Sequence, residues 1–264
     1  MKTENDKTKT SQTLARGLEV LHCFLSIGRV EDKYQMAELG IKELTQQLGL
    51  PQTVVARLVA TLAAYGYLQQ NRVTKKYFLG VSAFILGQAS GMQTNLRQVA
   101  QPWMEQLAEY TGETISCTIV DPITFEGVCI ASIDSLNEIK LTTKVGSVRP
   151  LHRGATRKVL LAFLEPWQQE MYLSKLTMTK WDRQQLVQEL EQIRMQHYAY
   201  SAEELDPGAF AIAAPIIAPS GSLLGSIAVA GPLFRKPDEL IVEWTQWVKD
   251  AASGVEDTLQ IKRI

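Results

Sequence analysis

The sequence contains few of the side chains that bind metals or form disulfides. Its 264 residues include three histidines and three cysteines, Cys23, Cys117 and Cys129, which lie far apart and form no Cys-x-x-Cys pair. This spacing matches neither a zinc site nor a disulfide framework. We therefore expect a protein of a reducing compartment that carries no metal and no cofactor.

Long apolar runs are also missing. No segment approaches the roughly 20 apolar residues of a membrane-spanning helix, and the polar run Met1–Gln12 lacks the apolar region of a signal peptide. These absences predict a cytoplasmic protein without membrane contact. The length exceeds that of one average domain, and the 45% of apolar residues are enough for two cores.

Charge is distributed unevenly, although the formal net charge is only −1. Residues 1–90 carry 11 Lys and Arg against 7 Asp and Glu, whereas residues 91–264 carry 16 against 21. Between residues 41 and 76, the cations Lys42, Arg57, Arg72, Lys75 and Lys76 are accompanied by a single acid, Glu43. This asymmetry indicates that the amino-terminal part meets a polyanion and that the remainder does not.

Residues 41–80 predict a winged helix-turn-helix. Ile41–Leu48 has apolar residues at helical spacing, Gly49 can end that helix in the left-handed conformation, and Pro51 suits the start of the next helix. The second helix, from about Gln52 to Ala64, has an inward stripe of Val55, Leu58, Val59 and Leu62. In a helix-turn-helix the second helix enters the major groove. Its polar face here consists of Gln52, Thr53, Ala56, Arg57 and Ala60.

Two short strands follow this pair of helices. Tyr67–Gln70 and Lys75–Leu79 are joined by a turn at Asn71–Thr74, and three cations lie on or beside the tip of the hairpin. Reading-helix side chains can reach base edges, whereas wing cations neutralise phosphates. We therefore predict that the DNA-contacting residues are Gln52, Thr53, Ala56, Arg57, Arg72, Lys75 and Lys76.

Further helices are predicted on either side of this unit. Thr13–Ser26 is amphipathic, with Leu14, Leu18, Leu21 and Leu25 on one face. Val81–Gly91 is mostly apolar, and we expect it to link two domains and to help hold a dimer together. The DNA-binding domain is thus placed at residues 12–80, the linker helix at 81–94 and a second domain at 95–264.

The second domain is expected to be α+β, with helices flanking a mainly antiparallel sheet. A helix that ends at Gly112 precedes strand-like runs at residues 114–120, 127–133 and 139–145, and two more strands, at 209–218 and 223–230, surround a Pro-Ser-Gly-Ser turn. Further helices are expected to begin near Ala155, at Pro166, at Asp182 as a cap, and at Pro237.

The order and spacing of these segments resemble the IclR-type bacterial transcriptional regulators. The resembling segments lie at residues 16–21, 43–44, 49–51, 57–58, 61–62, 66–68 and 77–80, and further similarities extend to the last hundred residues. The resemblance implies that the second domain is a GAF-like effector-binding domain. Because one reading helix covers only part of one groove, we expect a homodimer or a dimer of dimers on operator DNA.

Residues 146–158 are the most informative part of this second domain. They place arginines, a glycine and backbone N–H groups at the start of a helix, which suits a small carboxylate. The resemblance implies that this helix start forms one wall of an effector pocket. An ordinary strand-to-helix turn with solvent-facing arginines is the alternative. The candidate residues are Arg153, Gly154, Ala155, Thr156 and Arg157.

The opposite wall of the implied pocket departs from the family pattern. Family members that bind small keto-acids present hydroxyl or thiol side chains from two carboxy-terminal strands, whereas this sequence has Ala211, Ala228 and Ala230 there. Alanine cannot satisfy a buried polar ligand group, so glyoxylate-like or pyruvate-like effectors are disfavoured. Arg157 replaces the usual small residue before the lysine. A less polar carboxylate, aromatic or otherwise weakly polar, held by Arg157 or Arg153 suits this wall better, and a pocket that binds nothing is the other possibility.

We therefore expect a ligand-responsive transcription factor, acting as a repressor. One alternative is a ligand-sensing or protein-interaction module without DNA binding. Another is an enzyme in which Cys117 and His152 or His197 act as nucleophile and base. Cys117 alternates with Ile115 and Ile119 in an apolar strand, however, which is the pattern of a buried structural thiol.

Overall fold

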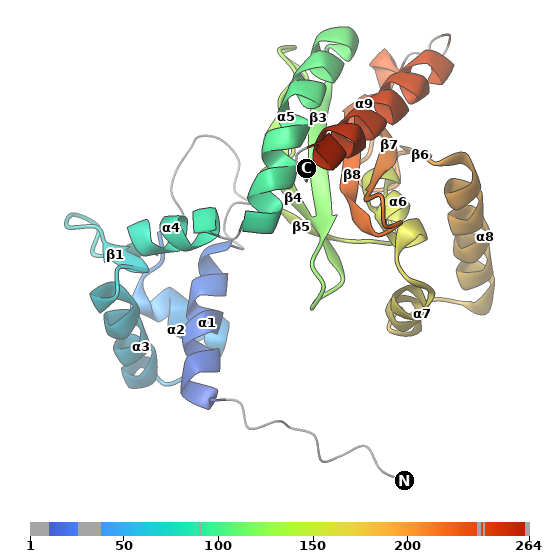
Figure 1. The fold of residues 1–264 in the computed structure, drawn as a ribbon. Coiled ribbons are helices and arrows are strands. Elements are labelled where there is room, and N and C mark those ends of the chain that lie inside the picture. The colour runs from blue at the N-terminus through green and yellow to red at the C-terminus, as the bar shows by residue number, and fades with distance from the viewer. Residues whose placement is uncertain (1–10, 26–37, 90, 237–238, 240, 262–264) are drawn as a thin grey trace. The chain divides into compact units, whose positions relative to one another are not determined.

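The computed structural model describes residues 11–25, 38–89, 91–236, 239 and 241–261. It divides into two compact units, Met1–Gly91 and Met92–Ile264. Each unit has its own apolar core, and together they have the α+β organisation predicted from the sequence (Figure 1).

The first unit is a helix-turn-helix with a short hairpin. Its elements are α1 (Gln12–Leu25), α2 (Ile41–Leu48), α3 (Gln52–Ala64), β1 (Leu68–Gln70), β2 (Tyr77–Leu79) and α4 (Val81–Ala89). β1 and β2 pair antiparallel, and an isolated bridge joins Leu39 to Tyr77. Val20, Leu44, Val55 and Val59 are fully buried at the centre of this unit.

The turn between α2 and α3 follows from its sequence. Gly49 adopts φ 62°, the left-handed conformation that ends helices, and its N–H donates to the Thr45 carbonyl at 3.0 Å. Pro51 lies one residue before α3, with a φ of −57° that suits a helix start. The predicted bounds of both helices are confirmed.

The leucine face of α1 that the sequence indicates is not the face that packs inward. Leu14 and Leu18 are 63% and 50% exposed, whereas Val20 and Phe24 are buried against the other helices of this unit. α1 carries apolar residues on two adjacent faces, so periodicity alone could not tell which face packs inward.

The second unit is a six-stranded antiparallel sheet covered by helices on both faces, within the part of the chain described. The order of its strands is β5-β4-β3-β8-β7-β6. In chain order the elements are α5 (Gly91–Thr111), β3 (Thr114–Val120), β4 (Glu126–Ile133), β5 (Val148–Pro150), α6 (Ala155–Phe163), α7 (Pro166–Ser174), α8 (Lys180–Gln196), β6 (Ala199–Ala202), β7 (Ala209–Ile217), β8 (Leu223–Pro232), the 3₁₀ turn η1 (Leu233–Arg235) and α9 (Ile241–Ile261).

The two faces of the sheet have different cores. Along β3, Ile115, Cys117 and Ile119 pack with α5 and α9, as Figure 1 shows for those two helices. Alternation turns Ser116 and Thr118 to the opposite face, which α6 covers together with α7 and α8. The polar residues of β3 therefore lie beneath α6.

α5 and α9 approach each other closely at one glycine. A Cβ built on Gly254 of α9 would lie 2.3 Å from the indole of Trp103 on α5, so no larger residue fits there without a shift. This contact fixes the two helices side by side over the sheet.

Two predictions for the second unit need correction. Residues 139–145 do not form a strand, because the carbonyls of Ile139 and Leu141 accept side-chain hydrogen bonds from Arg235 and Thr114 in place of a ladder; the strand lies later, at β5. Helix α8 begins after Thr179, whose hydroxyl accepts from the Asp182 N–H at 3.1 Å, so the cap is Thr179.

Two remaining differences concern elements near the end of the chain. Strand β6 was not predicted, since four residues give too short a pattern to recognise. The predicted helix start at Pro237 lies outside the described residues, and α9 is described from Ile241. Among the described helices, none combines the length and the hydropathy needed to cross a bilayer.

Candidate DNA-binding interface and effector site

Helix α3 presents its polar face to solvent. Its inward stripe packs into the core of the first unit, with Val55 and Val59 fully buried. Gln52, Thr53 and Arg57 are exposed on the other side, and Ala56 is half-buried. The structure thus brings the predicted reading residues together on one accessible helix face.

The side chain of Asn71 forms an Asx turn that shapes the wing. Asn71 Oδ1 accepts from the Val73 N–H at 2.8 Å and the Thr74 N–H at 3.3 Å. Glu38 holds the hairpin from outside, since its carboxylate accepts from Asn71 Nδ2 at 2.6 Å and from Thr74 Oγ1 at 2.7 Å. These hydrogen bonds lower the pKa of Glu38. Sequence reasoning missed Glu38, because its contacts lie 33 or more residues away along the chain.

One of the three wing cations is already paired. Lys76 Nζ lies 2.7 Å from Glu43 Oε1, and both side chains are about half exposed, at 42% and 43%. The same pairing lowers the pKa of Glu43. Arg72 and Lys75 are exposed and make no ion pair within the described residues, so they are the freer cations of the wing.

In the second unit, the start of α6 is tied to the strand β6 and the loop that follows it. Gly154 adopts φ 78° and its N–H donates to Glu204 Oε2 at 3.1 Å; the Ala155 N–H donates to Ser201 Oγ at 2.9 Å. These two backbone groups are therefore not free, contrary to the expectation from the sequence. Glu204 therefore ties the loop after β6 to the start of α6.

Lys158 strengthens the same connection. The Lys158 side chain is only 3% exposed, and its ammonium pairs with Glu189 of α8 and lies 2.7 Å from Glu204 Oε1. Glu204 thus bridges a backbone N–H and a buried cation at the start of α6. The lysine, both glutamates and Ser201 form one network that fixes this helix end.

Arg157 points into the protein. It is 8% exposed, and its Nε is buried without a hydrogen-bond partner in the described residues. A Cβ built on Gly127 of β4 would lie 3.0 Å from Arg157 Cγ, so the glycine makes room for the side chain. Burial lowers the pKa of Arg157, and so does the neighbouring Arg149. The turn with solvent-facing arginines is excluded for Arg157, whereas Arg153 is exposed.

The three predicted alanines lie on neighbouring strands. Ala211 pairs with Ala230 across β7 and β8, and Ala228 pairs with Ser116 of β3. Two hydroxyls lie close to them: Ser201 pairs with Ala211, and Ser226 donates to the Thr156 carbonyl at 3.0 Å. The wall is thus less apolar than its alanines suggested. The alternation of side chains along β8 could have identified Ser226 from the sequence, because it lies two residues before Ala228. Ser201 could be recognised only from the pairing register of β6 with β7.

The structure does not bring together Cys117 and His152, the nucleophile and base of the enzyme alternative. Cys117 is fully buried in the core beneath α5 and α9, and burial raises its pKa to about 12. His152 instead contacts α7, with Nδ1 2.8 Å from the Tyr172 hydroxyl, and its pKa is lowered by burial and by Arg153. No contact joins the two side chains in the described part of the chain.

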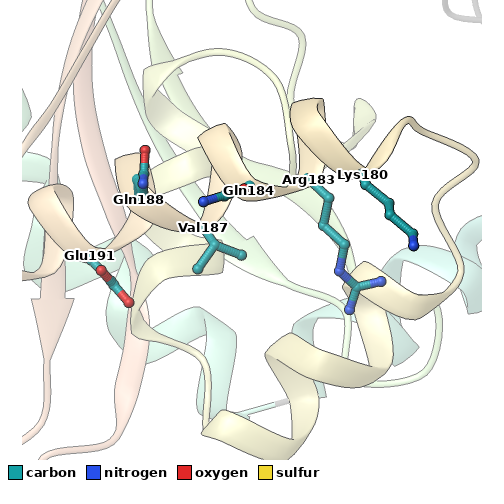
Figure 2. A pocket seen from close by; sticks show the side chains of 6 residues that line it. All are labelled: Lys180, Arg183, Gln184, Val187, Gln188 and Glu191. Carbon is teal, nitrogen blue, oxygen red and sulfur yellow. The ribbon is translucent and has the colours of Figure 1, made fainter.

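A surface depression on α8 is not a candidate effector site. It is lined by Lys180, Arg183, Gln184, Val187, Gln188 and Glu191, all on one helix (Figure 2). Arg183 there pairs with Glu170 at 2.8 Å. No cluster of three or more metal-ligating side chains occurs among the residues that the structure describes.

Two family profiles match the chain. The profile described as "IclR helix-turn-helix domain" matches residues 13–72, and "Bacterial transcriptional regulator IclR C-terminal" matches residues 88–257. The chain belongs to the IclR family. The resemblance in its motifs is confirmed, and it is a DNA-binding transcriptional regulator.

Individual IclR-type proteins match over most of their lengths. The HTH-type transcriptional regulator BhcR of Paracoccus denitrificans (strain Pd 1222) is 32% identical over 222 residues, which cover 81% of this chain and 78% of that protein. The transcriptional repressor IclR of Escherichia coli (strain K12) is 26% identical over 250 residues, covering 92% and 88%. A crystal structure of an IclR homolog from Microbacterium hydrocarbonoxydans, complexed with 4-hydroxybenzoate, shares the fold with a TM-score of 0.81 at 22% identity, covering 94% of this chain and 99% of that one.

Membership of the IclR family resolves the open alternatives for the kind of protein. The family consists of transcriptional regulators, so neither an enzyme nor a module without DNA binding describes this chain. The assignment of individual residues to DNA and to an effector stays a prediction.

Proposed function

We propose that this IclR-type protein is a homodimeric repressor that reads operator DNA with α3 and releases or retains it in response to a small carboxylate. The observation that carries the DNA part is the exposed face of Gln52, Thr53 and Arg57 on a helix whose opposite face is fully packed. Arg72 and Lys75 of the wing add phosphate contacts. Repression is proposed because relatives such as the Escherichia coli protein are named repressors.

A dimer is supported by exposed apolar side chains on the first unit. Phe84, Ile85 and Leu86 of α4 are 66%, 59% and 60% exposed, and Leu14 and Leu18 of α1 are also exposed. Exposed apolar clusters of this kind mark interaction surfaces. A second copy of the chain would bury them and place two reading helices on successive half-sites. A regulator of this kind works in the cytoplasm, where bacterial operators are found.

The effector is proposed to bind beside the start of α6. Arg157 offers a buried cation and Ala211, Ala228 and Ala230 offer small side chains, which suits a carboxylate with an aromatic or other weakly polar body. A relative of the same fold is complexed with 4-hydroxybenzoate, which has this chemistry. Arg153, Gly154, Ala155 and Thr156 complete the proposed wall.

Selection from random DNA followed by a gel-shift assay tests the DNA part. We expect one enriched palindromic sequence whose half-sites are separated by about one helical turn, roughly 10 base pairs. Failure to enrich any sequence would contradict the proposal. A thermal-shift screen of carboxylic acids tests the effector part, since a ligand that binds the native state raises Tm by mass action.

A further inference from the structure

Two arginines meet at the edge of the sheet beneath α6. Arg149 of β5 pairs directly with Gly127 of β4, so the two share a face of the sheet. The Cβ position of Gly127 on that face lies 3.0 Å from Arg157 Cγ. Arg149 also lowers the pKa of Arg157, as a nearby like charge does. Both arginine side chains therefore start beside Gly127, and their charges are close enough to influence each other.

Neither arginine has a carboxylate partner within the described residues. Arg157 is 8% exposed and makes no ion pair, although buried charges in proteins are normally paired. Asp206 influences the pKa of Arg157, but only after Arg149 and Cys129, and it forms no ion pair with it. No ion pair in the described part of the chain therefore neutralises the positive charge at this point.

A buried hydroxyl of β3, that of Thr118, also lacks a partner within the described residues. Thr118 is fully buried, and its Oγ1 makes no hydrogen bond in the described structure. The register shift between Cys117 and Thr118 sets Thr118 opposite Cys129, and its Cγ2 lies 3.4 Å from the Cβ position of Gly127. The methyl of Thr118, from the sheet, and Cγ of Arg157, from α6, therefore both lie beside Gly127.

We propose that Arg157, Arg149 and Thr118 form a subsite for a doubly charged oxyanion group, either a phosphate or two neighbouring carboxylates. Two guanidinium groups match two negative charges, and their N–H groups together with the Thr118 hydroxyl supply donors for several oxygens. This inference rests on the proposed effector function and specifies the charge of the effector.

Titration calorimetry with the full-length protein tests the subsite. The probes are inorganic phosphate, phthalate with two adjacent carboxylates, and benzoate with one, all at matched ionic strength. We expect phosphate or phthalate to bind saturably and benzoate to bind more weakly. Arg157→Ala and Arg149→Ala should each lower the affinity for the dianion by at least about tenfold. The control Arg183→Ala removes an arginine from the surface of α8 and should bind as the wild type does.

The variant Thr118→Val distinguishes a role of Thr118 in ligand binding from a role in stability. The change keeps the shape of the side chain and removes a buried hydroxyl that has no partner, so Tm of the free protein should rise, whereas dianion affinity should fall by about tenfold. A residue with only a structural role would not produce these opposite shifts. Gly127→Ala, with a methyl 3.0 Å from Arg157 Cγ, should narrow the subsite and also weaken binding.

Three outcomes would overturn the subsite. They are a wild type that binds neither dianion, benzoate affinity equal to that of phthalate, or wild-type affinity in Arg149→Ala and Thr118→Val. A loss of the proposed function would look different, because selection would then enrich no DNA sequence with the wild type. Operator binding that persists in the absence of dianion binding would refute this subsite alone.

Discussion

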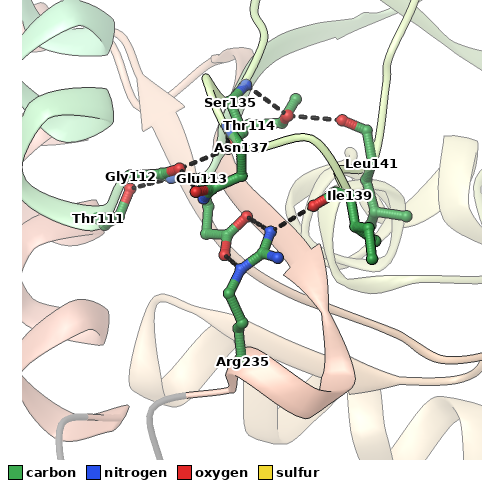
Figure 3. A network of polar contacts seen from close by, with 9 residues as sticks. All are labelled: Thr111, Gly112, Glu113, Thr114, Ser135, Asn137, Ile139, Leu141 and Arg235. Carbon is green, nitrogen blue, oxygen red and sulfur yellow. Dashed lines mark hydrogen bonds and ion pairs between the residues drawn. The ribbon is translucent and has the colours of Figure 1, made fainter.

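Glu113 and Arg235 form an ion pair with two hydrogen bonds between the start of β3 and the turn after β8. Arg235 Nε lies 2.6 Å from Glu113 Oε1, and Nη2 lies 3.0 Å from Oε2 (Figure 3). Glu113 is 2% exposed, and Gly231 provides the space for its carboxylate. Arg235 also donates to the Ile139 carbonyl, and Thr114 Oγ1 to that of Leu141, so this corner secures the loop after β4.

We expect Arg235→Ala to destabilise the second unit by about 3 kcal/mol, the lower end for breaking a buried pair, because water reaches the partly exposed arginine. Arg235→Lys keeps the charge but loses the bidentate geometry, and it should lower the free energy of unfolding by about 1 kcal/mol. Urea unfolding measures both. A cost below 1 kcal/mol for Arg235→Ala would show that the pair adds little.

Arg57→Ala should weaken operator binding more than binding to random DNA. A bidentate arginine–guanine contact contributes about 1–3 kcal/mol of discrimination, whereas a phosphate contact contributes equally on all sequences. Fluorescence anisotropy with selected and scrambled duplexes at one salt concentration measures the difference. Equal losses on the two duplexes would reduce Arg57 to a phosphate contact.

The wing cations should differ in their effect on salt dependence. Arg72→Ala and Lys75→Ala should each reduce the slope of log K against log salt by about one unit. Lys76→Ala should change it less, because Lys76 is paired with Glu43 in the free protein. Equal slope changes at all three positions would show that DNA breaks the Lys76 pair, and no change in the triple variant would mean that the wing does not touch DNA.

Cys117 and Cys129 should resist alkylation in the folded protein. Burial raises their pKa values to about 12 and about 11, so the reactive thiolate is scarce at pH 8. Because the folded-state pKa values lie above the ordinary 9.0, the stability they contribute is complete below pH 9 and decreases as pH rises toward 11 to 12. Mass spectrometry after iodoacetamide treatment, with and without urea, tests this; rapid labelling of either thiol in the native state would contradict it.

Phe84→Ser should weaken self-association without unfolding the first unit. Phe84 is 66% exposed, so its loss creates no cavity in the free chain, whereas a dimer interface would lose apolar contact area. Sedimentation velocity over a dilution series measures the change. Val73→Ser, at an 89% exposed residue of the wing, is the control, and an equal effect of both variants would argue against α4 as the interface.

Local signals in the sequence were enough to define the DNA-binding helices. A left-handed glycine and a proline next to it specify where α2 ends and α3 begins, since both act through their own backbone conformations. The same holds for β3, whose bounds agree with an apolar run, and for α7, which begins at Pro166 as predicted. The order of the sequence motifs was likewise sufficient to identify the family.

Contacts between distant segments were decided only by the tertiary structure. α1 has two apolar faces, and packing selected the one with Val20 and Phe24. The Glu43–Lys76 pair and the hydrogen bond from Gly154 to Glu204 join residues 33 and 50 positions apart, which no periodicity reports.

The effector region shows this division between sequence and structure most clearly. Sequence identified Arg157 as an unusual cation at a helix start and the alanines as small residues on two strands. Strand register then placed Arg149, Gly127 and Thr118 around that arginine and buried its charge. Charge and helix capping are properties of a residue and its neighbours along the chain, whereas burial and the absence of a partner depend on what the rest of the fold brings near.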